Sequence, residues 1–159
     1  MTRSMLWICS CFIFTGSAHG QTKVEFRGVW VATVDNIDWP TKGNFNSDSQ
    51  KTEFIKLLDM HRRNGMNALI VQVRPSADAF FPSPYEPWSE WLTGKQGMPP
   101  MPYYDPLEFM ITETHKRGME FHAWMNPYRA EFNIGRSSID SYDMSRIPKS
   151  RLSCVREND

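Results

Sequence analysis

Side chains that can hold a polar ligand gather in residues 118–129, where an alternating run ends at a proline. The polar or amphipathic positions are Glu120, His122, Trp124 and Asn126, and the apolar positions between them are Phe121, Ala123 and Met125. Because strand side chains alternate between faces, this pattern predicts a β-strand with one apolar and one polar face. The polar face becomes richer toward Asn126 and Arg129, as at the ligand-binding end of an α/β barrel strand. A half-exposed antiparallel strand is the alternative interpretation.

Two earlier strand ends carry similar groups. Residues 68–74 form a short apolar run with Gln72 and Arg74 on one face at its end, and Asp78 follows. Residues 26–34 form a run that is apolar on both faces, as expected of a parallel barrel strand. The loop after this run is dense in hydrogen-bonding groups and contains Asp35, Asn36, Asp38 and Trp39. Since the carboxyl ends of parallel strands converge on one rim, the sequence predicts one binding site built from three strand ends.

Several of these residues also have a purely structural interpretation. Asp35 and Trp39 could belong to a capped turn with a packing tryptophan. Arg74 and Asp78 could pair with each other, and His122 could be a hydrogen-bonded core residue, which we favour over a catalytic or metal-binding role. The residues for which we favour ligand contact are Arg74, Trp124, Asn126 and Arg129. The sequence has no phosphate-binding glycine loop, zinc-ligand spacing or Ser-His-Asp pattern, so we expect no metal and no cofactor.

Two helices are predicted to position these strands. The first covers residues 49–64, with Ser47 or Ser49 as its cap and Gly65 as its stop. Its expected apolar stripe is Phe54, Ile55, Leu57, Leu58 and Met60. The second begins after Asp105, which is followed by proline and then glutamate as in a capped helix start, and it ends at Gly118. Strands alternating with helices predict successive β/α units and a parallel sheet.

The connection over residues 75–104 is long, and it is rich in both aromatic residues and proline. Long connections in compact domains are usually functional or disordered, and disordered segments are poor in aromatic residues. We therefore predict an ordered lid or platform. Trp88 and Trp91 either form a stacking surface for a ligand or hold this loop in place.

The composition and the N-terminus place limits on partners and location. The chain has 159 residues with 18 basic and 18 acidic side chains, so it lacks the basic excess typical of nucleic-acid-binding proteins. Residues 1–20 resemble a signal peptide: Arg3, then an apolar run at 5–14 that is too short to span a bilayer, then small residues before Gln21. We expect export to the periplasm or the extracellular space. A lipid anchor on Cys11 is less favoured because this cysteine lies inside the apolar run. The mature chain would keep only Cys154, which allows no intramolecular disulfide.

The regular pattern fades after Arg129. Residues 24–147 read as a partial barrel domain, and residues 148–159 form a polar tail that looks aberrant or truncated. A complete (β/α)8 barrel needs about 250 residues, and three strands cannot close one. The expected fold is therefore α/β, the N-terminal part of a barrel with about three β/α units. We interpret the sequence as part of a larger enzyme, shortened by truncation or a frameshift.

Three runs, within residues 24–136, carry a resemblance to a known family. They read FRGVWVATVDNIDWP at 26–40, NALIVQVRPSAD with PSPYEPWSEWLTG at 67–78 and 82–94, and HKRGMEFHAWMNPYR at 115–129. Together they resemble the glycosyl hydrolase-like 10 family, exported or lipid-anchored bacterial (β/α)8 barrels linked to cell-wall or other glycans. The resemblance implies a glycoside hydrolase with a glycan substrate. It also implies that the catalytic acids lie on strand four and later, so we assign no catalytic residue here.

Two functional hypotheses follow from the resemblance. In the first, the chain supplies substrate-binding walls of a glycoside hydrolase and is inactive alone, because glycoside hydrolysis usually needs two positioned carboxylates. The expected substrate-binding residues are Asp35, Asn36, Trp39, Arg74, Asp78, His122, Trp124, Asn126 and Arg129. Trp39 would stack on a sugar ring, and the polar groups would bind hydroxyls. In the second hypothesis, the chain is a non-catalytic glycan-binding protein or the vestigial product of a truncated gene.

Overall fold

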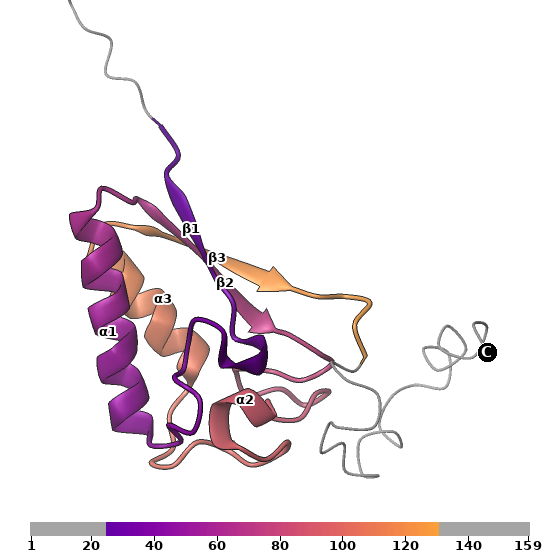
Figure 1. Ribbon diagram of the computed structural model, residues 1–159. Coiled ribbons are helices and arrows are strands. Elements are labelled where there is room, and N and C mark those ends of the chain that lie inside the picture. Colours follow the sequence, from indigo (N-terminus) through magenta and orange to yellow (C-terminus); the bar gives the residue numbers. More distant parts are fainter. Residues whose placement is uncertain (1–24, 131–159) are drawn as a thin grey trace, which may run out of the picture.

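The computed structural model describes residues 25–130, which form three parallel strands with connecting helices and loops (Figure 1). The strands are β1 (Gly28–Val31), β2 (Ala68–Arg74) and β3 (Glu120–Met125), and β2 lies between the other two. Helices α1 (Ser47–Arg63) and α3 (Pro106–Lys116) precede β2 and β3, while η1 (Val34–Asn36) and α2 (Glu90–Thr93) lie in the connecting loops. The predicted succession of β/α units is confirmed.

The pairing of the strands establishes the fold class. Gly28 of β1 lies opposite Ala68 of β2, and Ala68 lies opposite Glu120 of β3, with both pairs of strands parallel. The antiparallel alternative for residues 120–125 is therefore wrong. Both long helices cover the same side of the sheet (Figure 1), as the outer helices of a barrel do. The described residues form two β/α units and a third strand of an incomplete (β/α)8 barrel.

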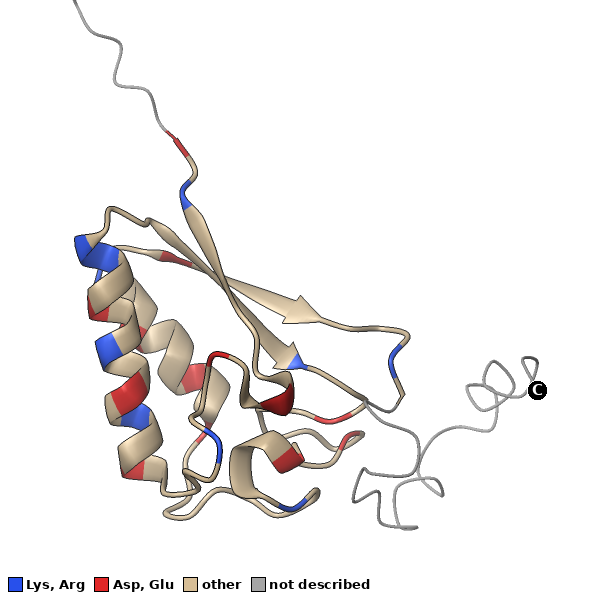
Figure 2. Ribbon diagram, viewed as in Figure 1, with Lys and Arg blue, Asp and Glu red and all other residues tan. Residues whose placement is uncertain are grey.

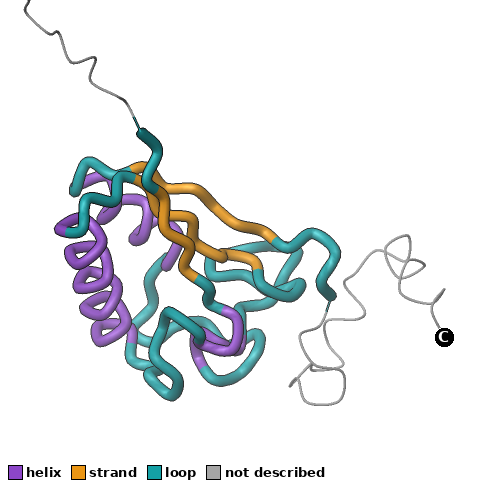
Figure 3. Tube along the Cα trace, turned by 45° about the horizontal axis from the view of Figure 1, so that its top comes forward, coloured by secondary structure: helices purple, strands orange, loops and turns teal. Residues whose placement is uncertain are grey.

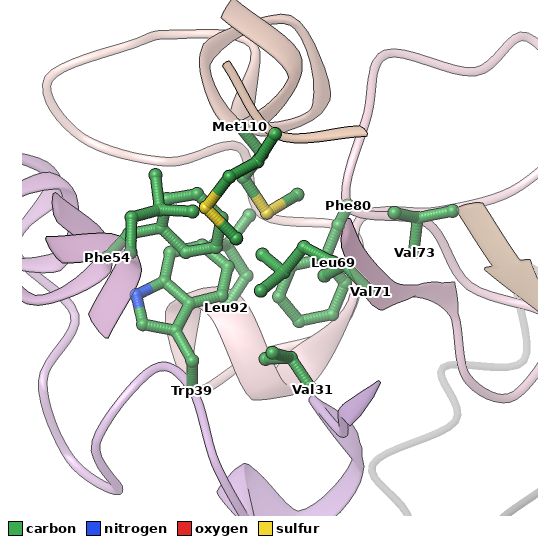
Figure 4. Close-up of a cluster of buried hydrophobic side chains, with 11 residues drawn as sticks. Val31, Trp39, Phe54, Leu69, Val71, Val73, Phe80, Leu92 and Met110 are labelled. Carbon is green, nitrogen blue, oxygen red and sulfur yellow. The ribbon is translucent and has the colours of Figure 1, made fainter. Parts of the chain in front are cut away.

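The core lies between this side of the sheet and the helices (Figure 4). Leu69, Val71 and Val73 of β2 are fully buried, together with Phe54 of α1 and Met110 of α3. The remaining buried members of the cluster are Val31, Trp39, Leu58, Phe80, Leu92 and Met119. Burying a large apolar side chain stabilises a fold by about 1.5–3 kcal/mol, so this layer fixes the sheet against its helices.

The starts and ends of the two long helices can be compared with the capping residues that the sequence predicts. Asn46, in extended conformation, caps α1 by accepting a hydrogen bond from the Ser49 amide at 3.0 Å, so the predicted cap at Ser47 or Ser49 was wrong. Asp105 caps α3 as predicted, because its side chain accepts hydrogen bonds from the backbone amides of Leu107 and Glu108. Gly65 follows α1 with φ of +81°, a conformation that favours glycine. Met60 is 43% exposed and does not belong to the buried stripe of α1.

Strand β1 is shorter than the predicted 26–34. After Val31 the chain leaves the sheet and turns into η1, where Asp35 and Asn36 adopt positive φ. The Gln72 side chain replaces a strand partner there, because its Oε1 accepts from the amides of Thr33 at 3.1 Å and Val34 at 3.0 Å. The residues of β1 are apolar on both faces as predicted, but only one face is covered among the described residues, since Trp30 is 62% exposed and Val31 is 1% exposed.

The long connection between β2 and α3 is ordered and packs below the carboxyl ends of the strands (Figure 3). A bridge joins Ala79 to Trp88, and Ser89 caps the short helix α2. Trp88 and Trp91 are partly buried against the core, which supports the interpretation that they hold the loop in place. Within residues 25–130 no helix is long and apolar enough to cross a membrane. The predicted signal peptide at 1–20 and the polar tail at 148–159 lie outside the described residues.

Candidate functional site

Arg74, at the carboxyl end of β2, is the centre of a polar network. Its Nε donates to Glu86 Oε1 at 2.5 Å, and its Nη1 donates to the backbone oxygen of Asn126 at 2.5 Å. The side chains of Arg74 and Glu86 are 13% and 17% exposed. The pairing of Arg74 with Asp78 was therefore wrong, because Glu86 in the following loop takes that position. The ion pair holds the guanidinium fixed at the rim of the sheet.

Asn126, just past β3, joins the ends of two strands. The backbone N–H of Asn126 donates to the Arg74 carbonyl at 3.0 Å, and its side-chain Nδ2 donates to the Pro75 carbonyl at 3.0 Å. Its Oδ1 accepts from Trp124 Nε1 at 2.8 Å, which fixes the orientation of that indole. The Trp124 ring also meets Trp30 of β1 edge to face, with centroids 5.1 Å apart. The structure thus brings Arg74, Trp124 and Asn126 together as predicted, with Trp30 beside them.

Asp78 lies below this network instead of on its surface. Only 2% of the residue is exposed, and its Oδ1 accepts from the Ser76 amide at 2.7 Å. Burial raises the pKa of Asp78 to about 6, although hydrogen bonds from the Ser89 side chain and the Ser76 amide act in the opposite direction. A buried carboxyl that closes a turn cannot contact a substrate in this conformation, so we remove Asp78 from the binding set.

Trp39 is also a core residue. It is 1% exposed, and its Nε1 donates to the Gln50 carbonyl at 3.0 Å. Its ring packs against Phe54 and Phe80, with centroids 5.3 and 6.0 Å away. A ring covered in this way has no face for a sugar, so the packing interpretation is the correct one for Trp39.

The remaining groups of the first strand end lie in η1. Asp35 is exposed and forms an ion pair with Lys42 at 3.1 Å. Asn36 Nδ2 donates to the Trp91 carbonyl at 2.7 Å, which ties this turn to α2. Asp35 therefore remains accessible to a ligand, whereas the amide of Asn36 already has a structural partner.

His122 and Arg129 complete the predicted set. His122 is exposed, so the buried-core interpretation is wrong; its Nε2 lies 3.1 Å from Glu120 Oε2, and its ring meets Phe26 edge to face at 5.5 Å. His122 sits two residues before Trp124 and is thus farther from the strand end. Arg129 is exposed on the segment that follows β3.

Three functional candidates were missed by sequence reasoning: Trp30, Gln72 and Glu86. Trp30 lies two residues after Gly28 and therefore on the same face of β1, opposite to the face of Val29 and Val31, so the period of the strand could have identified it. Gln72 was recognised as a neighbour of Arg74 but not as a ligand of the β1 backbone. Glu86 stands among prolines in a loop, where no periodic signal exists.

The side chains at this rim are mainly hydrogen-bonding and aromatic groups. Most charged residues lie on the helices and in the loops, and the strands carry few (Figure 2). Across residues 25–130, no group of three or more His, Cys, Asp or Glu could hold a metal ion. The carboxylates of Asp35, Asp78 and Glu86 each have a defined partner, and we assign none of them as a general acid or nucleophile. Amide, guanidinium and indole groups suit hydroxyl groups and sugar rings.

Comparison with known proteins agrees with this architecture. The model of the glycosyl hydrolase-like 10 family matches residues 25–153. The chain is 60% identical over 116 residues to the glycosyl hydrolase YngK of Bacillus subtilis (strain 168), a match that covers 73% of this chain and 22% of the relative. It is 43% identical over 126 residues to the glycosyl hydrolase DigH of Escherichia coli (strain K12), covering 75% of this chain and 28% of the relative. The chain thus spans about a quarter of the length of these relatives. With a match of this extent, the chain belongs to the glycosyl hydrolase-like 10 family.

Proposed function

We propose that this chain forms part of the substrate-binding wall of a glycoside hydrolase that acts on bacterial cell-wall or other polysaccharide glycans. The observation that carries the proposal is the network at the carboxyl ends of β2 and β3, which links Arg74, Glu86, Asn126 and Trp124. Ligands of (β/α)8 barrels bind at this end of the strands. The names of the two relatives, both glycosyl hydrolases, support the same class of substrate.

The network favours neutral hydroxyl groups as ligands. The charge of Arg74 is balanced by Glu86, and the Asn126 side chain, which bonds to the Pro75 carbonyl and the Trp124 indole, has a second amide hydrogen and a second oxygen lone pair for a ligand. A ring face beside such groups suits a sugar, which has an apolar face and a polar edge. Asp35 and Arg129 would contact more distant parts of a long glycan. In line with a polysaccharide outside the cytoplasm, we propose that residues 1–20 direct export to the periplasm or beyond.

The proposal is tested in a full-length member of the family that has asparagine at the position of Asn126. Asn126→Ala removes the acceptor of the Trp124 indole and a rim donor, and kcat/KM for glycan hydrolysis should fall about 10- to 100-fold, equivalent to about 1.5–3 kcal/mol. The matched control is Asn67→Ala, which removes hydrogen bonds with Arg27 and Glu25 at the opposite, amino end of the strands. This control should lower the melting temperature and leave kcat/KM unchanged.

The contrast between the two alanine variants decides the outcome. If kcat/KM falls more in Asn126→Ala than in the control variant while both variants have the same melting temperature, Asn126 has a binding role. Unchanged kinetics in Asn126→Ala, or a loss that only follows the melting temperature in both variants, would show that Asn126 is structural.

A second candidate function is glycan binding without hydrolysis. It is favoured by the carboxylates of the described rim, each of which is tied to a structural partner. Glycoside hydrolysis usually requires two carboxyl groups flanking the scissile bond. The purified 159-residue chain should therefore bind soluble glycan fragments without releasing reducing ends. Release of reducing ends above the level of a heat-denatured sample would reject this candidate.

A further inference from the structure

Two exposed tyrosines flank the polar network at the ends of β2 and β3. Among the exposed large hydrophobic residues of the described chain, Tyr128 at 97% and Tyr85 at 83% have the highest exposed fractions. Tyr85 immediately precedes Glu86, and Tyr128 follows Asn126 by two residues. The Glu86 carboxylate and the Asn126 carbonyl both accept hydrogen bonds from Arg74. The two most exposed of these side chains therefore adjoin the residues that hold the guanidinium.

The loop that presents Tyr85 is braced along its length. At its base, the Ala79 amide donates to the Pro87 carbonyl at 2.9 Å. Near its tip, Ser83 Oγ accepts from the amides of Tyr85 and Glu86, each at 3.2 Å. Three of residues 80–87 are prolines, whose rings fix φ. A side chain on so restricted a backbone loses little conformational freedom when it binds a ligand.

Within this loop, Tyr85 and Glu86 have different surroundings. The Glu86 side chain is 17% exposed and pairs with Arg74, whereas Tyr85 is 83% exposed. The Tyr85 ring therefore stands on the solvent side of the ion pair. By contrast, Tyr103, another exposed tyrosine, meets Trp88 edge to face with centroids 6.3 Å apart. Tyrosine combines an apolar ring with a polar tip, which suits the apolar face and the hydroxyl edge of a sugar.

Tyr128 is placed by the end of β3. The chain leaves this strand at Asn126, whose backbone N–H donates to the Arg74 carbonyl and whose Nδ2 donates to the Pro75 carbonyl. Tyr128 lies on the segment that continues past the arrow of β3 (Figure 1). Only Pro127 separates it from Asn126, so this exposed tyrosine is tied to the rim.

We propose that Tyr85 and Tyr128 contact sugar units on either side of the unit that lies against Trp124, so that the site takes an extended glycan chain. The inference rests on the proposed function and adds to it the length of the substrate. A disaccharide bound at Trp124 would leave at least one of the two tyrosines without a contact, whereas a longer oligosaccharide would reach both.

The groups between the two tyrosines suit a polysaccharide. Tyr85 and Tyr128 are separated by the Arg74 guanidinium, which has a hydrogen-bonded partner on each side. A ligand that touches both rings must therefore extend across the guanidinium and its partners. The charge of Arg74 is balanced by Glu86, so uncharged units that carry hydroxyl groups can lie over it. Repeated sugar units also supply repeated apolar faces, one for each aromatic ring.

NMR titrations of the ¹⁵N-labelled 159-residue chain with a disaccharide and an octasaccharide from bacterial cell-wall glycan test this inference. The Trp124 indole signal reports the binding of either glycan. Tyr85→Ala and Tyr128→Ala should each weaken octasaccharide binding about three- to tenfold, the effect of one aromatic contact, and leave the dissociation constant of the disaccharide unchanged. Tyr85→Phe should keep the wild-type affinity, because the ring remains. Tyr103→Ala is the matched control, because Tyr103 is 63% exposed but lies in the loop before α3.

The Trp124 signal separates failure of this inference from failure of the proposed function. If the signal shifts with both glycans while either Tyr85→Ala or Tyr128→Ala keeps the wild-type octasaccharide affinity, the inference is overturned and the proposed function stands. If the signal shifts with neither glycan in the wild type, both are rejected. The inference is also overturned if Tyr103→Ala weakens octasaccharide binding as much as the other two alanine variants do. A changed circular dichroism spectrum in those two variants would likewise overturn it, because it would show that the tyrosines stabilise the fold.

Discussion

At the scale of single residues, the buried carboxyl of Asp78 makes stability depend on pH. Its pKa is raised to about 6 mainly by burial, and the neighbouring Glu90 acts in the same direction. Between about pH 4 and 6 the folded chain holds a proton that the unfolded chain has lost, so the free energy of unfolding falls as the pH rises. The stabilisation is complete below the unfolded pKa and is lost through pH 6. The loss is at most about 3 kcal/mol, from about two pKa units.

The Asp78→Asn variant tests this dependence because it keeps the shape of the side chain and an acceptor for the Ser76 amide. Urea unfolding at pH 4.5 and pH 7 should show that the wild-type chain loses more stability over this range than the variant does. As a control, Asp48→Asn changes a 74% exposed carboxylate and should follow the wild type. Equal pH dependence in wild type and Asp78→Asn would contradict a raised pKa at Asp78.

The sequence predicted where polar groups gather but not which of them face solvent. Arg74 and Asn126 were identified because they stand at strand ends, and the structure brings them together. Trp39, in the loop after β1, and Trp124, near the end of β3, are the same residue type, yet one is in the core and the other is at the rim. The difference depends on packing against Phe54 and Phe80, which no local pattern encodes.

At the scale of elements, the cap of α3 provides a direct test of how the helix is fixed. Asp105 accepts from the amides of Leu107 at 2.9 Å and Glu108 at 3.1 Å. Asp105→Ala should lower the free energy of unfolding by about 1 kcal/mol, since these amides would lose their partner. Asp48→Ala, in the first turn of α1, removes only an exposed ion pair with Lys51 and should cost less than about 0.5 kcal/mol.

Urea denaturation of the two variants compares a cap with a surface charge. Equal and small effects would mean that solvent satisfies the first turn of α3 as well as Asp105 does. The cap was readable in the sequence because aspartate, proline and glutamate stand in a local pattern. The start of α1 was misplaced because asparagine and two serines at 46–49 are all good caps, and the backbone conformation of Asn46 selects among them. Strand β1 was predicted too long because Gln72, distant in sequence, satisfies the amides after its end.

At the scale of the whole molecule, the side of the sheet opposite α1 and α3, where Trp30 is 62% exposed, predicts self-association of the chain alone (Figure 1). The two unpaired edges of the described sheet, β1 and β3, differ from each other, so one copy can add to the next head to tail and the assembly has no fixed size. Light scattering should show an average mass that rises with protein concentration. Trp30→Asp should reduce this rise, and a single monomeric mass at all concentrations would contradict the prediction.

The fold of the described chain was more predictable than its site. Helix and strand periods, glycine stops and the order of elements sufficed to predict a parallel sheet of three strands joined by helices. The site depends on long-range contacts such as Glu86 with Arg74 and Trp30 with Trp124, and these form only when the loop and the strands are assembled. The gathering of polar groups at the strand ends was therefore predicted, while their contact partners were not.

The account rests on a glycan contacting the rim beside Trp124, and an NMR titration of the indole N–H groups tests this most directly. Soluble oligosaccharides prepared from bacterial cell-wall glycan are added to the ¹⁵N-labelled chain, and single Trp→Phe variants assign the signals. We predict that the Trp124 signal shifts progressively, because its Nε1 is bound to Asn126 at the rim. The Trp39 signal, from a core residue that is 1% exposed, should stay in place. A Trp124 signal that does not move at saturating oligosaccharide, or that moves no more than that of Trp39, would contradict the account.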